Sequence, residues 1–142
     1  GNEIVSAAKA LKKKKLLGFL ADQDGYIHGL PVPFLGQPSS AVVGPATFAK
    51  KFGSPVVPIF ASRKPEGGHI VHILPPLHYN NSGDDDVDMY TLTEECVRVT
   101  EDFIREHPDE WIWFQHRWMT KMSEIVDYDK KLEIRERAHE KQ

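Results

Sequence analysis

Two short apolar runs constrain the fold of this chain more than any other feature. Residues 16–21 (LLGFLA) and 55–61 (PVVPIFA) lack the alternation of a half-exposed strand. Runs of this kind are typical of strands buried on both faces, as in parallel sheets. The first run ends abruptly in the turn residues of positions 22–25 (DQDG). Pro58 interrupts the second run and favours an edge or a bulge there, because proline cannot donate a ladder hydrogen bond.

Helical patterns flank these runs. Residues 4–15 carry apolar side chains at helical spacing, and residues 44–53 begin with Gly-Pro and end in glycine. A capping-box pattern at residues 91–94 predicts a further helix that Pro108 stops. A strand over residues 69–74 follows its predecessor after a short link, which favours antiparallel pairing of the two. The order helix, strand, helix, strand, strand, helix predicts an α/β domain with a mixed, largely parallel sheet flanked by helices.

The length of 142 residues fits one domain. We divide it into a domain over residues 1–122 and a charged, helical tail over residues 123–142. Residues 26–40 are rich in proline and glycine and form a loop. We expect this loop to be ordered, because several of its side chains are apolar and need a place to pack: Leu30, Val32, Phe34 and Leu35.

Composition excludes several classes of protein. The net charge of −3 gives no bias toward nucleic acid, so we expect no nucleic-acid partner. Cys96 is the single cysteine, which rules out an internal disulfide. No apolar run approaches the length of about eighteen residues that a membrane span needs, so we expect these residues to be soluble.

Asp22 and Asp24 stand at the end of the first predicted strand. Ligands of open α/β sheets collect at the carboxyl ends of strands, where a carboxylate orients a histidine or binds a polar head group. The alternative is that both acids only shape a turn, since aspartate and glycine are favoured turn residues.

The seven histidines suggest no metal site. His69 and His72 are three positions apart, which in a strand places them on opposite faces. His107 and His116 lack zinc-ligand spacing. Residues 12–15 (KKKK) favour the solvated face of a helix, with attraction of anionic head groups or an acidic carrier protein as the alternative.

Residues 109–118 (DEWIWFQHRW) concentrate aromatic side chains. If this segment is helical, Trp111, Phe114 and Trp118 share one face, with Arg117 beside it. Packing in the core is the favoured interpretation. An interfacial role is the alternative, because tryptophan and arginine both suit a boundary between water and an apolar phase.

Three segments together resemble one family. They are residues 19–24 (FLADQD) with 32–36 (VPFLG), residues 44–58 (GPATFAKKFGSPVVP) and residues 108–118 (PDEWIWFQHRW). Their order and spacing resemble the C-terminal half of bacterial lipid A biosynthesis acyltransferases, the late-acting lauroyl and myristoyl branch of the lysophospholipid acyltransferase superfamily. The resemblance implies the C-terminal part of a glycerolipid-acyltransferase-like fold.

The resemblance also implies an activity. Members of that family move a fatty acyl chain from acyl carrier protein, or from a thioester such as acyl-CoA, to a hydroxyl of a lipid A precursor or related glycolipid. They need no metal or organic cofactor, and they work at the cytoplasmic face of the bacterial inner membrane. Their hallmark is a histidine followed five positions later by an acid, and no histidine of this chain has one. The resemblance therefore places the catalytic pair and the membrane anchor upstream, and we expect these residues to be inactive alone.

The resemblance assigns roles to several residues that are present. Asp22 aligns best, and Asp24 second, with an acid that supports the active site or acceptor binding. Arg63 and Lys64 resemble the family's basic pair, which meets phosphate or the acidic face of the carrier. Arg117 lies in the family's terminal signature, where it buttresses the site or faces a head group.

A second hypothesis belongs to a different class of protein. The chain would then be a stand-alone, non-catalytic α/β module that binds an acyl-lipid or a protein partner. Under the first hypothesis we also expect self-association of the isolated piece, because a domain without its other half exposes apolar surface.

Overall fold

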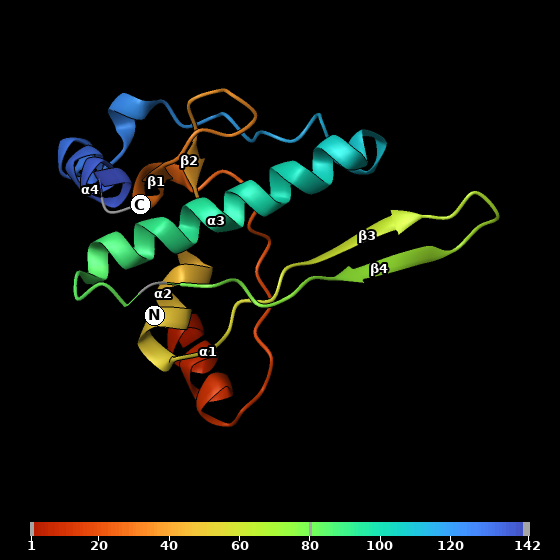
Figure 1. Ribbon diagram of the computed structural model, residues 1–142, viewed down its shortest axis with the longest axis horizontal. Helices are drawn as coiled ribbons and strands as arrows, with labels where there is room; N and C mark the ends of the chain where they lie inside the picture. The colour runs from red at the N-terminus through yellow and green to blue at the C-terminus, as the bar shows by residue number, and fades with distance from the viewer. Residues whose placement is uncertain (1, 80, 141–142) are drawn as a thin grey trace.

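The computed structural model describes residues 2–79 and 81–140, and Figure 1 shows the order of their helices and strands. The long helix α3 crosses the molecule, and a β-hairpin made of β3 and β4 projects to one side of it. The elements are α1 (Asn2–Lys12), β1 (Leu30–Pro31), β2 (Ser40–Ala41), α2 (Gly44–Phe52), β3 (Ile59–Arg63), β4 (His69–Ile73), α3 (Asp85–Glu106) and α4 (Tyr128–Glu140), with 3-10 turns at Tyr26–His28, Pro108–Glu110 and Met122–Glu124.

The prediction for the second helix is confirmed. Pro45 lies in the first turn of α2, where its missing N–H leaves no intrahelical bond unmade. Gly53 ends the helix in the left-handed conformation with φ of 61°, and its N–H donates to the carbonyl of Ala49. The antiparallel hairpin is confirmed as well, with Ile59 paired to Ile73 and Arg63 paired to His69.

The predicted α/β class is confirmed, but a largely parallel sheet is not found among the described residues. The described residues form two antiparallel sheets of two strands each, β1–β2 and β3–β4. Residues 16–21 are not in a strand, and Leu16 and Leu20 are 100% and 72% exposed. The physical reason is that a strand in the centre of a parallel sheet needs a backbone partner along each edge. Residues 16–22 make no backbone–backbone hydrogen bond to any described residue.

Helix α3 begins earlier than the sequence pattern predicts. Asp84 is the N-cap, and its carboxylate accepts a hydrogen bond from the N–H of Val87 at 3.2 Å. The prediction of a capping box at Thr91 is therefore wrong. Thr91 lies inside the helix, where its hydroxyl donates to the carbonyl of Val87 at 2.9 Å. The end of the helix before Pro108 agrees with the prediction.

The core lies between α3, the 30–43 loop region and α4. Tyr90 is fully buried and donates its hydroxyl proton to the carbonyl of Pro31 at 3.2 Å. Helix α4 adds Ile134 and Ala138 to the same cluster, so the tail predicted from its charge also supplies core residues. The loop over residues 26–40 is ordered, as expected, and buries three of its apolar side chains: Leu30, Val32 and Phe34.

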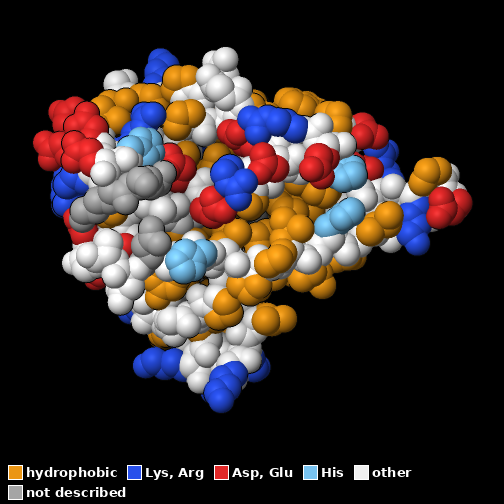
Figure 2. Space-filling view, viewed as in Figure 1, with side chains coloured by type: hydrophobic (Ala, Val, Ile, Leu, Met, Phe, Trp, Pro, Cys, Tyr) orange, Lys and Arg blue, Asp and Glu red, His pale blue; other side chains and the backbone are white. Residues whose placement is uncertain are grey.

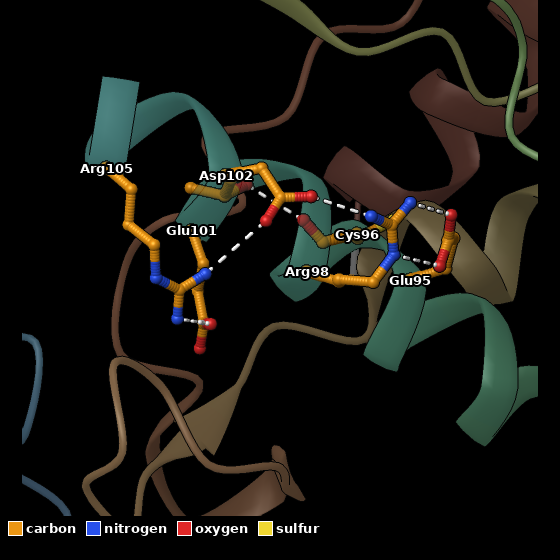
Figure 3. Close-up of polar contacts among 7 residues, drawn as sticks. Glu95, Cys96, Arg98, Glu101, Asp102 and Arg105 are labelled. Atoms are coloured by element: carbon orange, nitrogen blue, oxygen red, sulfur yellow. Dashed lines mark hydrogen bonds and ion pairs between the residues drawn. The ribbon is translucent and has the colours of Figure 1, made fainter. Parts of the chain in front are cut away.

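The outer face of α3 carries a row of ion pairs, which Figure 3 shows. Arg98 contacts Glu95 and Asp102, both at 2.6 Å, and Arg105 contacts Glu101 at 2.6 Å. Exposed pairs of this kind contribute little stability. Glu101 has a second task, because its other oxygen accepts a hydrogen bond from the N–H of Leu35 at 2.7 Å. This contact ties the 34–37 turn to the helix.

A partly buried ion pair joins α2 to α3. The ammonium of Lys50 lies 2.7 Å from Asp88, whose side chain is fully buried. The N–H of Ser82 donates to the same carboxylate at 3.1 Å. The hydrogen bond to Asp88 raises the pKa of Lys50 to about 12. Burial alone raises the pKa of Asp88, but the hydrogen bonds from Lys50 and Ser82 outweigh burial and hold it below its usual value.

Among the residues described, no helix combines the length and the apolar character needed to cross a lipid bilayer.

Candidate functional site

Asp22 is held by two neutral donors from the far end of the chain. The indole N–H of Trp111 donates to Oδ2 at 3.0 Å, and the amide of Gln115 donates to the same oxygen at 3.2 Å. The residue is half-buried. Its Oδ1 makes no hydrogen bond to a described residue. The hydrogen bonds to one oxygen therefore fix the carboxylate, and the other oxygen remains available to accept a further hydrogen bond.

Asp24 has a different environment. Oδ1 accepts hydrogen bonds from the N–H of Tyr26 at 2.7 Å and the hydroxyl of Thr120 at 2.6 Å, and Oδ2 accepts from the N–H of Thr120 at 3.0 Å. Burial on its own raises the pKa of Asp24, but the hydrogen bonds from Thr120 and Tyr26 outweigh it and lower the pKa. Both oxygens are occupied, so Asp24 fixes the 24–26 turn against the segment around Thr120.

Arg117 lies in the interior, within electrostatic reach of Asp24 and Asp22. Its side chain is buried, with the guanidinium 4.5 Å from the ring centre of Phe34. Nη1 donates to the carbonyl of Ser40 at 2.9 Å, while Nε and Nη2 have no partner among the described residues. Burial lowers the pKa of Arg117, and the charges of Asp24 and Asp22 act against that shift. The structure thus brings Asp22, Asp24 and Arg117 into one electrostatic cluster.

Aromatic rings form a wall next to this cluster. Phe34 lies 5.5 Å from Trp111 and 5.7 Å from Trp118, measured between ring centres. The expectation that a helix puts Phe114 on the same face is wrong, because residues after the 3-10 turn at 108–110 follow an irregular path. Phe114 is 89% exposed. The Trp111 and Trp118 part of the core prediction is confirmed, since both rings pack on the main core.

An open groove of about 490 Å³ runs past Asp24. Glycines and apolar side chains make up most of its lining, including Gly18, Phe19 and Val43. Gly44 lies where a Cβ would come within 2.6 Å of the ring of Phe19, so the close approach of these two residues requires glycine. His28 also lines the groove.

Arg63 lies outside the Asp22 cluster. Its guanidinium contacts Glu110 at 3.1 Å and the carbonyl of Asp109 at 3.0 Å. Its backbone N–H donates to the other oxygen of Glu110 at 2.8 Å. These contacts tie the end of β3 to the turn that precedes Trp111. Lys64 follows in the hairpin turn and is exposed, and its side chain makes no hydrogen bond or ion pair to a described residue.

The described histidines do not meet the candidate acids. His72 shares a 2.8 Å hydrogen bond with Ser62, and His139 lies 2.9 Å from Glu94. None of them hydrogen-bonds to Asp22 or Asp24. Over residues 2–79 and 81–140, no cluster of three histidine, cysteine or acidic side chains could hold a metal ion.

Sequence reasoning found the acids but missed the residues that hold them. Trp111 was expected in the core or at an interface, and no role was predicted for Gln115 or Thr120. A usable signal was the polar amide of Gln115 inside an aromatic segment, because a buried amide or indole N–H needs an acceptor. The acceptor, Asp22, lies so far back along the chain that periodicity alone could not identify it.

The geometry defines a fixed carboxylate, Asp22, whose sequence neighbours Gln23 and Asp24 line an open groove, although Asp22 itself does not line it. Such a carboxylate can orient a base or accept a proton from a substrate hydroxyl. The family model for bacterial lipid A biosynthesis acyltransferases matches residues 1–120. The chain therefore belongs to the bacterial lipid A biosynthesis acyltransferase family.

Two relatives extend this comparison. A phosphatidylinositol mannoside acyltransferase of Mycobacterium tuberculosis (strain ATCC 25618 / H37Rv) is 24% identical over 117 residues, which are 82% of this chain and 35% of the relative. The protein of the same name from strain CDC 1551 / Oshkosh is 25% identical over 114 residues, which are 80% of this chain and 34% of the relative. The chain thus spans about a third of the length of these curated relatives.

Proposed function

We propose that this chain is the C-terminal part of an acyltransferase that moves a fatty acyl group onto a hydroxyl of a lipid A precursor or related glycolipid. The donor is acyl carrier protein carrying the chain as a thioester, or acyl-CoA. The observation that carries the proposal is the two-donor hold on Asp22, in a chain whose family match covers residues 1–120. The site of action is the cytoplasmic face of the bacterial inner membrane, reached through a segment outside these residues.

Asp22 positions the base in this proposal. A histidine from the rest of the polypeptide removes the proton of the acceptor hydroxyl, and the oxygen attacks the thioester carbonyl. The carbon–sulfur bond then breaks, and the leaving thiolate takes up the proton. Oδ1 of Asp22 accepts a hydrogen bond from the imidazole and stabilises its cation, while Trp111 and Gln115 keep the carboxylate in place.

The basic residues divide into two groups. Lys64 is exposed and makes no ion pair to a described residue, which suits a contact to phosphate or to an acidic carrier. Arg63 is shared with Asp109 and Glu110, so it reaches a substrate only if it leaves these acids. Arg117 is buried and acts from behind the site, where it donates to the carbonyl of Ser40 and lies over the ring of Phe34.

The acceptor is proposed as a glycolipid from two lines of support. The family description concerns lipid A, and the two M. tuberculosis relatives are named for phosphatidylinositol mannoside. Both are hydroxyl-bearing lipids with sugar head groups. The groove beside Asp24, with its apolar and glycine-rich lining, supplies room for part of the acyl chain.

The test is an acyl-transfer assay on the full-length polypeptide, with radiolabelled acyl carrier protein and a lipid A precursor as substrates. Asp22→Asn keeps the shape of the side chain but removes its charge, and we expect the rate of transfer to fall about 100-fold. Asp129→Asn, at an exposed position of α4, is the matched control and leaves the rate unchanged. Equal rates for wild type and Asp22→Asn contradict the role of Asp22.

The same assay separates the two classes of function. We expect residues 1–142 alone to give no turnover with either donor, because the base is proposed to come from elsewhere in the polypeptide. Saturable binding of acylated lipid by a full-length polypeptide that never transfers the acyl group would instead support the non-catalytic binding module.

A further inference from the structure

The hairpin β3–β4 has one covered face and one uncovered face. On the covered face, Phe60 stacks on Phe103 of α3 with 4.5 Å between ring centres, and Ser62 and His72 share a hydrogen bond at 2.8 Å. On the other face, Ile59, Val71 and Ile73 are between 60% and 68% exposed. Strand alternation puts these three on the same side, because Ile59 pairs with Ile73 and Val71 with Ala61.

This uncovered face lacks the usual protection of an exposed sheet. Natural edge strands carry charged or bulged positions that block pairing, whereas the outer positions of this hairpin, apart from Arg63 and His69 at one end, are aliphatic. A two-stranded hairpin in water is marginal by itself and needs a third strand or a covering layer. Figure 2 shows hydrophobic side chains gathered between the charged face of α3 and the hairpin, and along the hairpin itself.

A second apolar segment is also exposed and without strand partners. Residues 16–20 are in no helix or strand, are mostly exposed, and make no backbone–backbone hydrogen bond to a described residue. The hairpin likewise has two edges with no strand beside them, since its sheet contains β3 and β4 alone among the described residues. Unpaired backbone groups on two apolar stretches indicate that strands from another polypeptide segment belong beside them.

We propose that the outer face of β3–β4, defined by Ile59, Val71 and Ile73, is the docking surface for a further, strand-bearing segment of the same acyltransferase polypeptide. The inference rests on the proposed function, in which this chain is one part of a longer enzyme. The M. tuberculosis relative supports that occupant, because the matched residues make up 35% of its length. The remaining length is ample for strands at the hairpin edge and a layer over its aliphatic face.

The test measures how fast N-ethylmaleimide modifies a cysteine placed on the surface. Cys96 is buried, and burial raises the pKa of its thiol to about 12, so it does not react under these conditions. Val71→Cys therefore supplies the reactive thiol of residues 1–142. We expect it to be modified about tenfold or more slowly in the full-length polypeptide than in residues 1–142 alone, read by peptide mass spectrometry.

Glu66→Cys in the exposed hairpin turn is the matched control and reacts at the same rate in both. Equal rates at position 71 in the two polypeptides overturn the proposal, as does a reading frame that encodes no further segment. If the modification rate of Val71→Cys in residues 1–142 falls as their concentration rises, the surface binds a second copy of the chain and the proposal is overturned. If Val71→Cys is modified more slowly in the full-length polypeptide but that polypeptide transfers no acyl group, the proposed function is wrong and the docking surface is retained.

Discussion

Asp22 and Asp24 are two positions apart but serve different purposes, because their hydrogen-bond partners differ. Asp24 uses both oxygens to bind Tyr26 and Thr120, whereas Asp22 uses one oxygen to bind Trp111 and Gln115. Both hypotheses for these acids therefore describe part of the geometry, since Asp24 shapes a turn and Asp22 keeps an oxygen free of described partners. Within this pair, Asp22 is the better candidate for chemistry.

The environment of Asp24 predicts a pH dependence of stability. Its folded-state pKa lies below the usual 3.8, so the ionised form stabilises the fold above about pH 4, and that contribution is lost as pH falls through the lowered pKa. Asp24→Asn places an amide N–H₂ against the N–H of Thr120 and should lower the free energy of unfolding by about 1.5–3 kcal/mol at pH 7.

Urea unfolding of both proteins between about pH 3 and 7 measures this difference. We expect the gap to be full near neutral pH and to close toward the acid end. Asp129→Asn, with its exposed side chain, should follow the wild type throughout. A gap that is the same at every pH would mean that the charge of Asp24 contributes nothing.

At the scale of the site, the sequence identified which residues belong to the site but did not predict the contacts among them. Asp22, Asp24 and Arg117 were singled out from the sequence, and in the structure the charges of Asp24 and Asp22 oppose the effect of burial on the pKa of Arg117. Arg63 was named as a substrate contact, yet it is shared with Asp109 and Glu110. A family motif preserves which residues are present, while the pairing of a long side chain depends on neighbours that only the folded chain brings close.

The elements show the same limit. Helix α2 and the antiparallel hairpin were predictable because their signals are local: a proline and a glycine at the two ends of the helix, and a short turn between two strands. Residues 16–21 failed as a predicted strand because a strand is defined by its partners. The apolar composition of that run predicts burial. The run would be buried only with other strands paired beside it, and no described residue pairs with it in this way.

The joint between α2 and α3 depends on one cation, which gives a prediction at the scale of elements. Lys50→Met leaves the buried carboxylate of Asp88 without its charged partner. We expect the melting temperature to fall by about 5 °C or more at pH 7. The loss should shrink in acid, because an unpaired buried carboxylate has a raised pKa and becomes protonated.

Scanning calorimetry at about pH 7 and pH 4 gives both numbers. Lys51→Met, at the next and exposed position of the same helix, is the matched control and should melt with the wild type. If Lys50→Met and Lys51→Met melt together, the ion pair does not hold the two helices.

At the scale of the whole molecule, the described residues divide into a packed body and a projecting hairpin (Figure 1), and the outer face of the hairpin is apolar. In residues 1–142 alone, Val71→Lys with Ile73→Lys should leave the free energy of unfolding within about 0.5 kcal/mol of wild type, because both side chains are already in solvent. The same change should lower the aggregated fraction, because it removes an exposed aliphatic strand face.

Phe60→Lys provides the contrast on the opposite face of the same hairpin. It removes the ring that stacks on Phe103, so we expect a loss of about 2 kcal/mol or more in the free energy of unfolding. Light scattering during size exclusion and urea unfolding measure the two effects separately. Outer-face lysines that destabilise as strongly as Phe60→Lys would show that residues 1–142 already cover this face, and the division into body and hairpin would be wrong.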